Sequence, residues 1–270
     1  MCIVLVLAGV CVGVLSGMLG IGGGVVMVPM LRLFFGIDAY MVTATSLFAI
    51  IPTSISGAVT HLRAKTCIPK LGLALGIGGA ITSSLGVYLA SISPAWLIMV
   101  VAAIIVAYSA YTMLRKAIKM GASGKPKPAS AGAAKTQHAG EDEFVVTSRR
   151  LLGGLGIGVI AGLASGYVGV GGGFVMVPLM TAWLAVPMKK ASGTSLIAII
   201  ILAIPGVIEQ AMFGHVDFLV GIMLCIGAIP GAVLGAKMVP HVPERTLRFV
   251  FAGVLAIAAV GLVLKETGMM

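Results

Sequence analysis

Two glycine-rich segments carry the groups best suited to bind a solute. Residues 16–30 read SGMLGIGGGVVMVPM and residues 165–179 read SGYVGVGGGFVMVPL, with ten of fifteen positions identical. Glycine permits positive φ angles and lets a solute approach the backbone closely. A helix that resumes after such a segment begins with N–H groups that have no partner inside the helix. Because the positive end of the helix dipole lies at the same place, each segment predicts a binding site for a small anion.

Polar residues at matching positions extend this candidate site. Two serines open the glycine segments and add hydroxyl donors, and a Thr-Ser pair follows each segment inside the next apolar stretch. Hydroxyls in such helices either bond to their own backbone or line the cavity and bind the solute or a coupling cation, and both interpretations remain open. The predicted substrate-binding residues are Ser16, Gly17, Gly20, Gly22, Gly23, Gly24, Thr45, Ser46, Ser165, Gly166, Gly169, Gly171, Gly172, Gly173, Thr194 and Ser195.

The glycines have a structural alternative, since small residues also let membrane helices pack closely. We favour binding because the pattern is doubled and a V-M-V-P run follows it each time. Paired hydrophobic segments that are interrupted by glycine indicate the binding site of a transporter. A dinucleotide site is excluded, since the glycines follow no strand-like segment and no GK[ST] follows them.

Composition places these segments in a membrane. The 270 residues are 59% hydrophobic and 10% charged, whereas soluble domains carry roughly 25% charged residues. A helix needs about 20 apolar residues to cross a bilayer, so we expect an all-α polytopic membrane protein. No Ser–His–Asp set, Cys–His set or HExxH spacing lies in the spans, which argues against an enzyme, a metal site or a cofactor. The apolar stretches cover about 1–35, 39–60, 71–92, 95–114, 151–186, 192–213, 217–239 and 246–264.

The repeat extends over nearly the whole chain. An offset of 149 residues without a gap aligns Thr45 with Thr194 and Gly57 with Gly206. Residues 121–143 are rich in Gly, Ala, Ser, Pro and Lys, a composition that cannot build a core. We therefore expect one membrane repeat in residues 1–115, a cytoplasmic flexible linker in 116–150 and a second repeat in 151–270.

The distribution of positive charge predicts the orientation of the two repeats. The net charge of +10 arises from Lys and Arg between apolar segments, where orientation signals belong. If stretches 1–35 and 151–186 enter and leave on one side, as re-entrant hairpins or short crossings, 16 of the 18 Lys and Arg residues are cytoplasmic. A single crossing leaves only 12 inside. We expect two inverted repeats with both termini outside, each with about three full helices and a broken hairpin, which makes about eight to ten membrane segments.

The possible partners follow from the same charges. Without a basic patch interleaved with aromatic residues, nucleic acid is not expected. Titratable groups near a transport path can relay protons, and His61 and Glu209 lie near the ends of spans, although solvation is their simpler explanation. A coupling proton and a coupling sodium ion both remain open, and an oligomer is possible.

These motifs resemble one known family. The doubled SGxxGxGGGxxxVP(L/M), each copy followed by Ala44-Thr45-Ser46 or Gly193-Thr194-Ser195, is similar to the TauE/SafE sulfite-exporter family. The resemblance implies a permease of the cytoplasmic membrane of a bacterium or archaeon. It also implies a cargo of small sulfur oxyanions and organosulfonates, such as sulfite or sulfoacetate, usually moved outward. We therefore expect a secondary transporter that exports such anions, with a channel-like facilitator of small anions or weak acids as the alternative.

Overall fold

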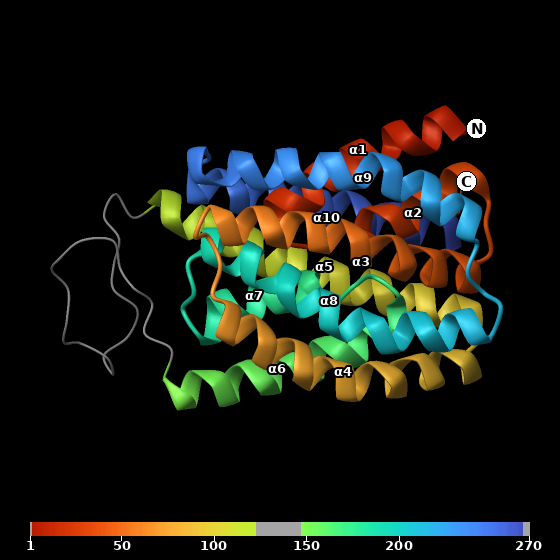
Figure 1. The fold of residues 1–270 in the computed structure, drawn as a ribbon, viewed down its shortest axis with the longest axis horizontal. Helices are drawn as coiled ribbons and strands as arrows, with labels where there is room; N and C mark the ends of the chain where they lie inside the picture. Colours follow the sequence, from red (N-terminus) through yellow and green to blue (C-terminus); the bar gives the residue numbers. More distant parts are fainter. Residues whose placement is uncertain (1, 123–146, 267–270) are drawn as a thin grey trace, which may run out of the picture.

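The computed structural model describes residues 2–122 and 147–266, and every regular element in these two ranges is a helix (Figure 1). The prediction of an all-α polytopic membrane protein is confirmed, because six of these helices (α3, α4, α5, α6, α8 and α9) are long and apolar enough to cross a membrane. The helices are α1 (Cys2–Leu19), α2 (Gly24–Phe35), α3 (Ala39–Arg63), α4 (Pro69–Ile92), α5 (Ala95–Ala122), α6 (Ser148–Val168), α7 (Gly173–Trp183), α8 (Met188–Met212), α9 (Phe218–Met238), the 3-10 turn η1 (Val239–His241) and α10 (Glu244–Glu266).

The internal repeat recurs in the helix boundaries. Adding 149 to the bounds of α3 gives 188–212, which are the bounds of α8. The same shift carries the end of α1 at Leu19 onto the end of α6 at Val168. Thus α1 to α5 and α6 to α10 are two copies of one helical order.

Each copy begins with a hairpin of two helices that has one short arm. The second arms, α2 and α7, have 12 and 11 residues, or roughly 16–18 Å at 1.5 Å per residue, against a hydrocarbon core of about 30 Å. In Figure 1 both termini lie at one end of the molecule, and α2 returns to that end. At the opposite end α5 stops and α6 starts, and α7 returns there.

The two copies interleave. α1 packs on α9, α6 packs on α4, and α5 packs on α10, so each hairpin lies against a helix of the other copy. Glycines make the approach close: a Cβ at Gly13 would collide with the backbone at Ala228 of α9, and one at Gly162 would collide with Gly79 of α4. α3 and α8 pack on each other and have the largest buried share among the candidate spans.

Both ends of the predicted linker, residues 116–150, belong to helices. Residues 116–122 are the last turns of α5, and residues 148–150 form the first turn of α6. Thr147 is the N-cap residue of α6, and the remainder of the predicted linker, residues 123–146, lies outside the described residues.

Candidate functional site

Both glycine segments interrupt helices at the same position. α1 ends because Gly20 takes a φ of +71° and its N–H donates to the Ser16 carbonyl at 2.8 Å. α6 ends in the same way, with Gly169 at +74° and its N–H 2.7 Å from the Ser165 carbonyl. A left-handed glycine at this position is a common C-terminal cap of helices. The predicted breaks are therefore present in both copies.

The chain then turns and starts a half-helix. Gly22 and Gly23 have φ angles of +83° and +87°, and α2 begins at Gly24. Among the described residues, none of these three N–H groups donates a hydrogen bond to the protein. The matching turn at Gly171 and Gly172 has φ angles of +84° and +69°. Here the N–H of Gly173 donates to the Gly171 carbonyl at 2.9 Å, and the N–H groups of Gly171 and Gly172 are unused. Each half-helix is thus preceded by unused donors beside the positive end of its dipole.

The two breaks lie against each other. A Cβ at Gly24 would lie 2.6 Å from the Val170 carbonyl oxygen, and one at Gly173 would lie 2.9 Å from the carbonyl carbon of Ile21. Since real Cβ atoms never approach backbone so closely, only glycine fits at these positions. The N-termini of α2 and α7, from opposite copies, therefore meet in one place.

One unpartnered hydroxyl accompanies each break. Ser16 and Ser165 are buried, with exposed fractions of 1% and 0%, and neither side-chain oxygen has a hydrogen-bond partner. The Cβ of Ser16 would be 3.6 Å from a Cβ placed on Gly23, and the Cβ of Ser165 would be 3.3 Å from one placed on Gly172. A buried hydroxyl without a partner costs about 1–3 kcal/mol. Its repetition in both copies, beside unused N–H groups, indicates a site for a solute.

The carbonyl groups that end α1 and α6, those of Gly20 and Gly169, are already used. Ser46 Oγ of α3 donates to the Gly169 carbonyl at 2.7 Å, and Ser195 Oγ of α8 donates to the Gly20 carbonyl at 2.7 Å. Each hydroxyl shares its single proton with a carbonyl of its own helix, that of Thr43 at 2.9 Å or that of Ser192 at 2.8 Å. Each serine therefore caps the helix end of the opposite copy. With the Gly20 and Gly169 carbonyls occupied, the serine hydroxyls and the unused N–H groups of the turns are left to bind an anion.

The two threonines also join the copies. Thr45 Oγ1 accepts from the Asp217 N–H at 3.0 Å, and Thr194 Oγ1 accepts from the Ile68 N–H at 2.9 Å. Both accept at the start of a helix, α9 or α4. In this conformation the hydroxyls of both Thr-Ser pairs are engaged with protein groups, and their predicted role as solute ligands stays a prediction.

Gly17 and Gly166 lie one position past the serines and serve packing. A Cβ at Gly17 would collide with the Ala232 carbonyl of α9, and one at Gly166 would collide with the Ser83 carbonyl of α4. These two predicted site residues thus match the structural alternative for glycine, since they seat the hairpins against the opposite copy.

Two isoleucines occupy the space between the breaks. Ile50 of α3 and Ile199 of α8 are fully buried and correspond by the 149-residue offset. A Cβ at Gly22 would touch the side chains of both, and one at Gly171 would also touch both. Sequence reasoning missed them because an isoleucine in an apolar helix is unremarkable, and only the offset could have singled them out.

His61 is a buried polar residue near the first hairpin. Its exposed fraction is 0%, its Nε2 lies 2.8 Å from the Gly17 carbonyl oxygen, and its Nδ1 lies 2.7 Å from Thr66 Oγ1. A carbonyl can only accept, so Nε2 carries a proton and donates it. In the second copy the histidine stands at the other position of this pair. Gln210 corresponds to His61 and His215 to Thr66, and His215 Nδ1 lies 3.1 Å from Gln210 Oε1. The expectation of simple solvation for His61 is therefore wrong, because packing excludes water from it.

Comparisons with known proteins agree with this architecture. The chain is 28% identical over 263 residues to the "Probable membrane transporter protein YunE" of Bacillus subtilis, with 94% of each chain covered. It is 26% identical to a "Probable membrane transporter protein" of Methanocaldococcus jannaschii, covering 94% of this chain and 92% of that protein. Relatives thus occur in bacteria and archaea. No solved structure matches.

A family profile covers both repeats. The profile described as "Sulfite exporter TauE/SafE" matches residues 5–262, which include both glycine breaks and both Thr-Ser pairs. The six candidate spans and the relatives named as transporters point to the same class. The chain belongs to the TauE/SafE family of membrane transport proteins.

Proposed function

We propose that this protein is a secondary transporter that exports small sulfur-containing anions by alternating access around the paired helix breaks. The observation that carries the proposal is the pair of buried serine hydroxyls without partners beside the unused N–H groups of the glycine turns. Ser16 and Ser165 have buried hydroxyls without partners, unused N–H groups of the glycine turns flank them, and the carbonyls of Gly20 and Gly169 are capped. Preformed donors in a buried place replace the hydration of an anion.

The chemistry of the site suits sulfite or an organosulfonate such as sulfoacetate. A sulfur oxyanion presents up to three oxygens, which two facing sets of N–H and hydroxyl groups can surround. No cationic side chain lies among the site residues, so the anion would be held by dipoles and hydrogen bonds rather than by an ion pair. The family description supports the same cargo.

The arrangement of charge supports an inverted orientation of the two copies in the cytoplasmic membrane of a prokaryote. The described loops and helix ends at the end where α5 stops contain Arg63, Lys65, Lys70, Lys189 and Lys190. The opposite end, which contains both termini, has Asp38 and Asp217 as helix N-caps. By the positive-inside tendency the first end is cytoplasmic. The hairpin α6–α7 then enters from the cytoplasm and α1–α2 from outside.

Movement of the isoleucines gives alternating access a structural basis. Ile50 and Ile199 fill the space beside both glycine turns, so a solute reaches the turns only when one of them moves. Since Ile50 is on α3 and Ile199 on α8, displacement of one helix would open the site from one side at a time. A coupling proton on His61 or on half-buried Glu209, or a sodium ion held by hydroxyls and carbonyls, would supply the energy.

Flux in proteoliposomes tests this function. Labelled sulfite, sulfoacetate, taurine and lactate are supplied in turn, with and without an imposed proton or sodium gradient. Saturable, gradient-dependent movement of the sulfur anions, with lactate excluded, is expected. Equal and unsaturable passage of all four solutes would replace the transporter by a channel-like facilitator, and no flux of any would remove sulfur anions as the cargo.

A further inference from the structure

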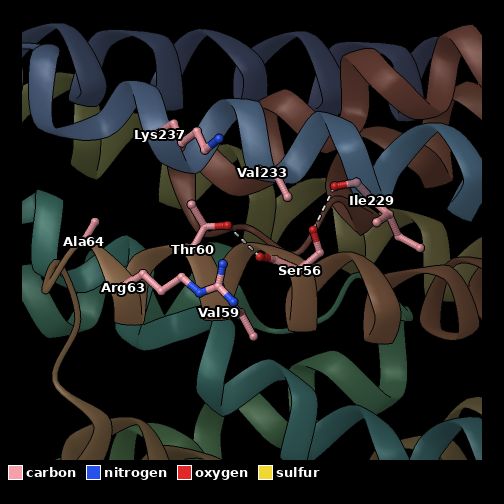
Figure 2. A pocket seen from close by; sticks show the side chains of 8 residues that line it. All are labelled: Ser56, Val59, Thr60, Arg63, Ala64, Ile229, Val233 and Lys237. Atoms are coloured by element: carbon pink, nitrogen blue, oxygen red, sulfur yellow. Dashed lines mark hydrogen bonds between the residues drawn. The ribbon is translucent and has the colours of Figure 1, made fainter.

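A groove between α3 and α9 lies away from the helix breaks. Its volume is about 530 Å³, and Figure 2 shows Arg63 of α3 and Lys237 of α9 near one end of it, with Ser56 and Ile229 farther along. It is lined by Ser56, Val59, Thr60, Arg63, Ala64, Ile229, Val233 and Lys237. The groove therefore has a cationic end and a largely apolar remainder.

The two cations are available to a ligand. In the described part of the chain neither Arg63 nor Lys237 has a hydrogen bond or ion pair, and no carboxylate lines the groove. The hydroxyls are occupied, since Thr60 Oγ1 donates to the Ser56 carbonyl at 3.0 Å and Ser56 Oγ donates to the Ile229 carbonyl at 2.8 Å (Figure 2). The polar end thus offers positive charge alone, which suits a phosphate.

The remainder of the groove faces outward and is apolar. Val59 and Ile229 are 41% and 39% exposed, and the neighbouring Ile55 and Leu62 are also exposed. In a helix of this hydropathy an exposed apolar face contacts lipid chains. Seven residues separate Ser56 from Arg63, about 10 Å along a helix, so a molecule lying here would have its charged end near the helix terminus and its tail toward the membrane interior.

The second copy of the repeat lacks the cations. The offset of 149 residues places Met212 where the first copy has Arg63, and Tyr88 where α9 has Lys237. The offset also places Glu209 of α8 where α3 has Thr60. Positive charge at the cytoplasmic end of the protein is enough to set its orientation in the membrane, and Lys65 in the α3–α4 loop and Lys70 at the start of α4 already supply it. It does not require two cations from different helices in one groove.

We propose that this groove binds an anionic phospholipid, with its phosphate between Arg63 and Lys237 and an acyl chain along Val59, Ile229 and Val233. Basic pockets between membrane helices at the cytoplasmic surface are suited to such headgroups. The site goes beyond the transport function and does not depend on it. Bound lipid would hold α3 against α9, and α3 also carries Ser46 and Ile50.

Lipid binding to the full-length protein tests the proposal. Delipidated protein in detergent is titrated with phosphatidylglycerol or with phosphatidylcholine of the same chains, and bound lipid is counted by native mass spectrometry. We expect preferential retention of phosphatidylglycerol, reduced at least fivefold in Arg63→Gln/Lys237→Gln. The matched control Lys65→Gln/Lys70→Gln removes the same charge from exposed positions at the same end and should retain lipid as the wild type does.

Two further arms separate the possible ligands. Val233→Trp fills the groove and leaves both cations, so it should reduce lipid retention as strongly as the double charge variant does. Inorganic phosphate at millimolar concentration should not displace the lipid, since it cannot use the apolar part. Displacement by phosphate, unchanged retention in the groove variants, or equal losses in both charge pairs would overturn the proposal.

Discussion

Replacing Ser16 and Ser165 by alanine tests whether their hydroxyls bind the solute or serve only in packing. Both hydroxyls are buried and unpartnered in this conformation, and such a group destabilises a fold by about 1–3 kcal/mol. Ser16→Ala/Ser165→Ala should therefore leave the free energy of unfolding unchanged or raise it. Losing a hydrogen bond to a charged ligand removes about 1.5–3 kcal/mol of binding, so the sulfite concentration at half-maximal flux should rise about 10- to 150-fold per serine used.

The matched comparison uses the serines that cap the opposite copy. Ser46→Ala/Ser195→Ala leaves the buried carbonyls of Gly169 and Gly20 without the donors that now lie at 2.7 Å. Each change should lower the free energy of unfolding by about 1–3 kcal/mol. At about 2–4 °C per kcal/mol, the midpoint of thermal unfolding should fall by several degrees.

The assay measures thermal unfolding in detergent and half-saturation of sulfite flux in proteoliposomes for both pairs. The reasoning predicts opposite results: weakened half-saturation without loss of stability for the first pair, and loss of stability for the second. If Ser16→Ala/Ser165→Ala destabilises the protein as much as the capping pair and leaves half-saturation within twofold of the wild type, the site has been misidentified.

Three other perturbations test separate parts of the account. Gly23→Leu and Gly172→Leu place a side chain at φ angles of +87° and +69°, which costs about 1–2 kcal/mol each in backbone strain. Both variants should abolish sulfite flux while the protein still reaches the membrane. Normal flux would refute the role of the turns. Ile50→Ala/Ile199→Ala should open a leak, seen as sulfite efflux that no longer depends on an imposed gradient, and a rate equal to that of the wild type would show that these side chains do not close the path. Burial raises the pKa of the Cys67 thiol, between α3 and α4, to about 11. Because the thiolate is the reactive form, the rate of maleimide labelling of Cys67 should rise about tenfold per pH unit from pH 7 to 10. A plateau of this rate near pH 9 would indicate an ordinary exposed thiol.

The sequence predicted the helix breaks well because their cause is local. A left-handed turn needs glycine, and the doubled pattern placed those glycines at Gly20, Gly22 and Gly23 and at their counterparts. A short arm in each hairpin followed from length alone, since 35 residues cannot make two full crossings; length did not indicate that it would be the second arm.

Long-range partners were out of reach of the sequence. Ser46 bonds to Gly169, 123 residues away, and that contact depends on how α3 packs against the second hairpin. For the same reason nothing local distinguished Gly17, which packs on α9, from Gly23, which forms the turn. The unused hydroxyl of Ser16 became visible only once every neighbouring donor and acceptor had been placed.

Counterflow of sulfite tests the central claim most directly. Proteoliposomes are loaded with millimolar unlabelled sulfite and diluted into a trace of labelled sulfite, with no other gradient imposed. A carrier whose paired breaks open to one side at a time should accumulate label transiently above its external concentration, and Gly23→Leu should abolish this overshoot. Entry of label that never exceeds equilibrium and grows in proportion to concentration would contradict alternating access and leave an open path in its place.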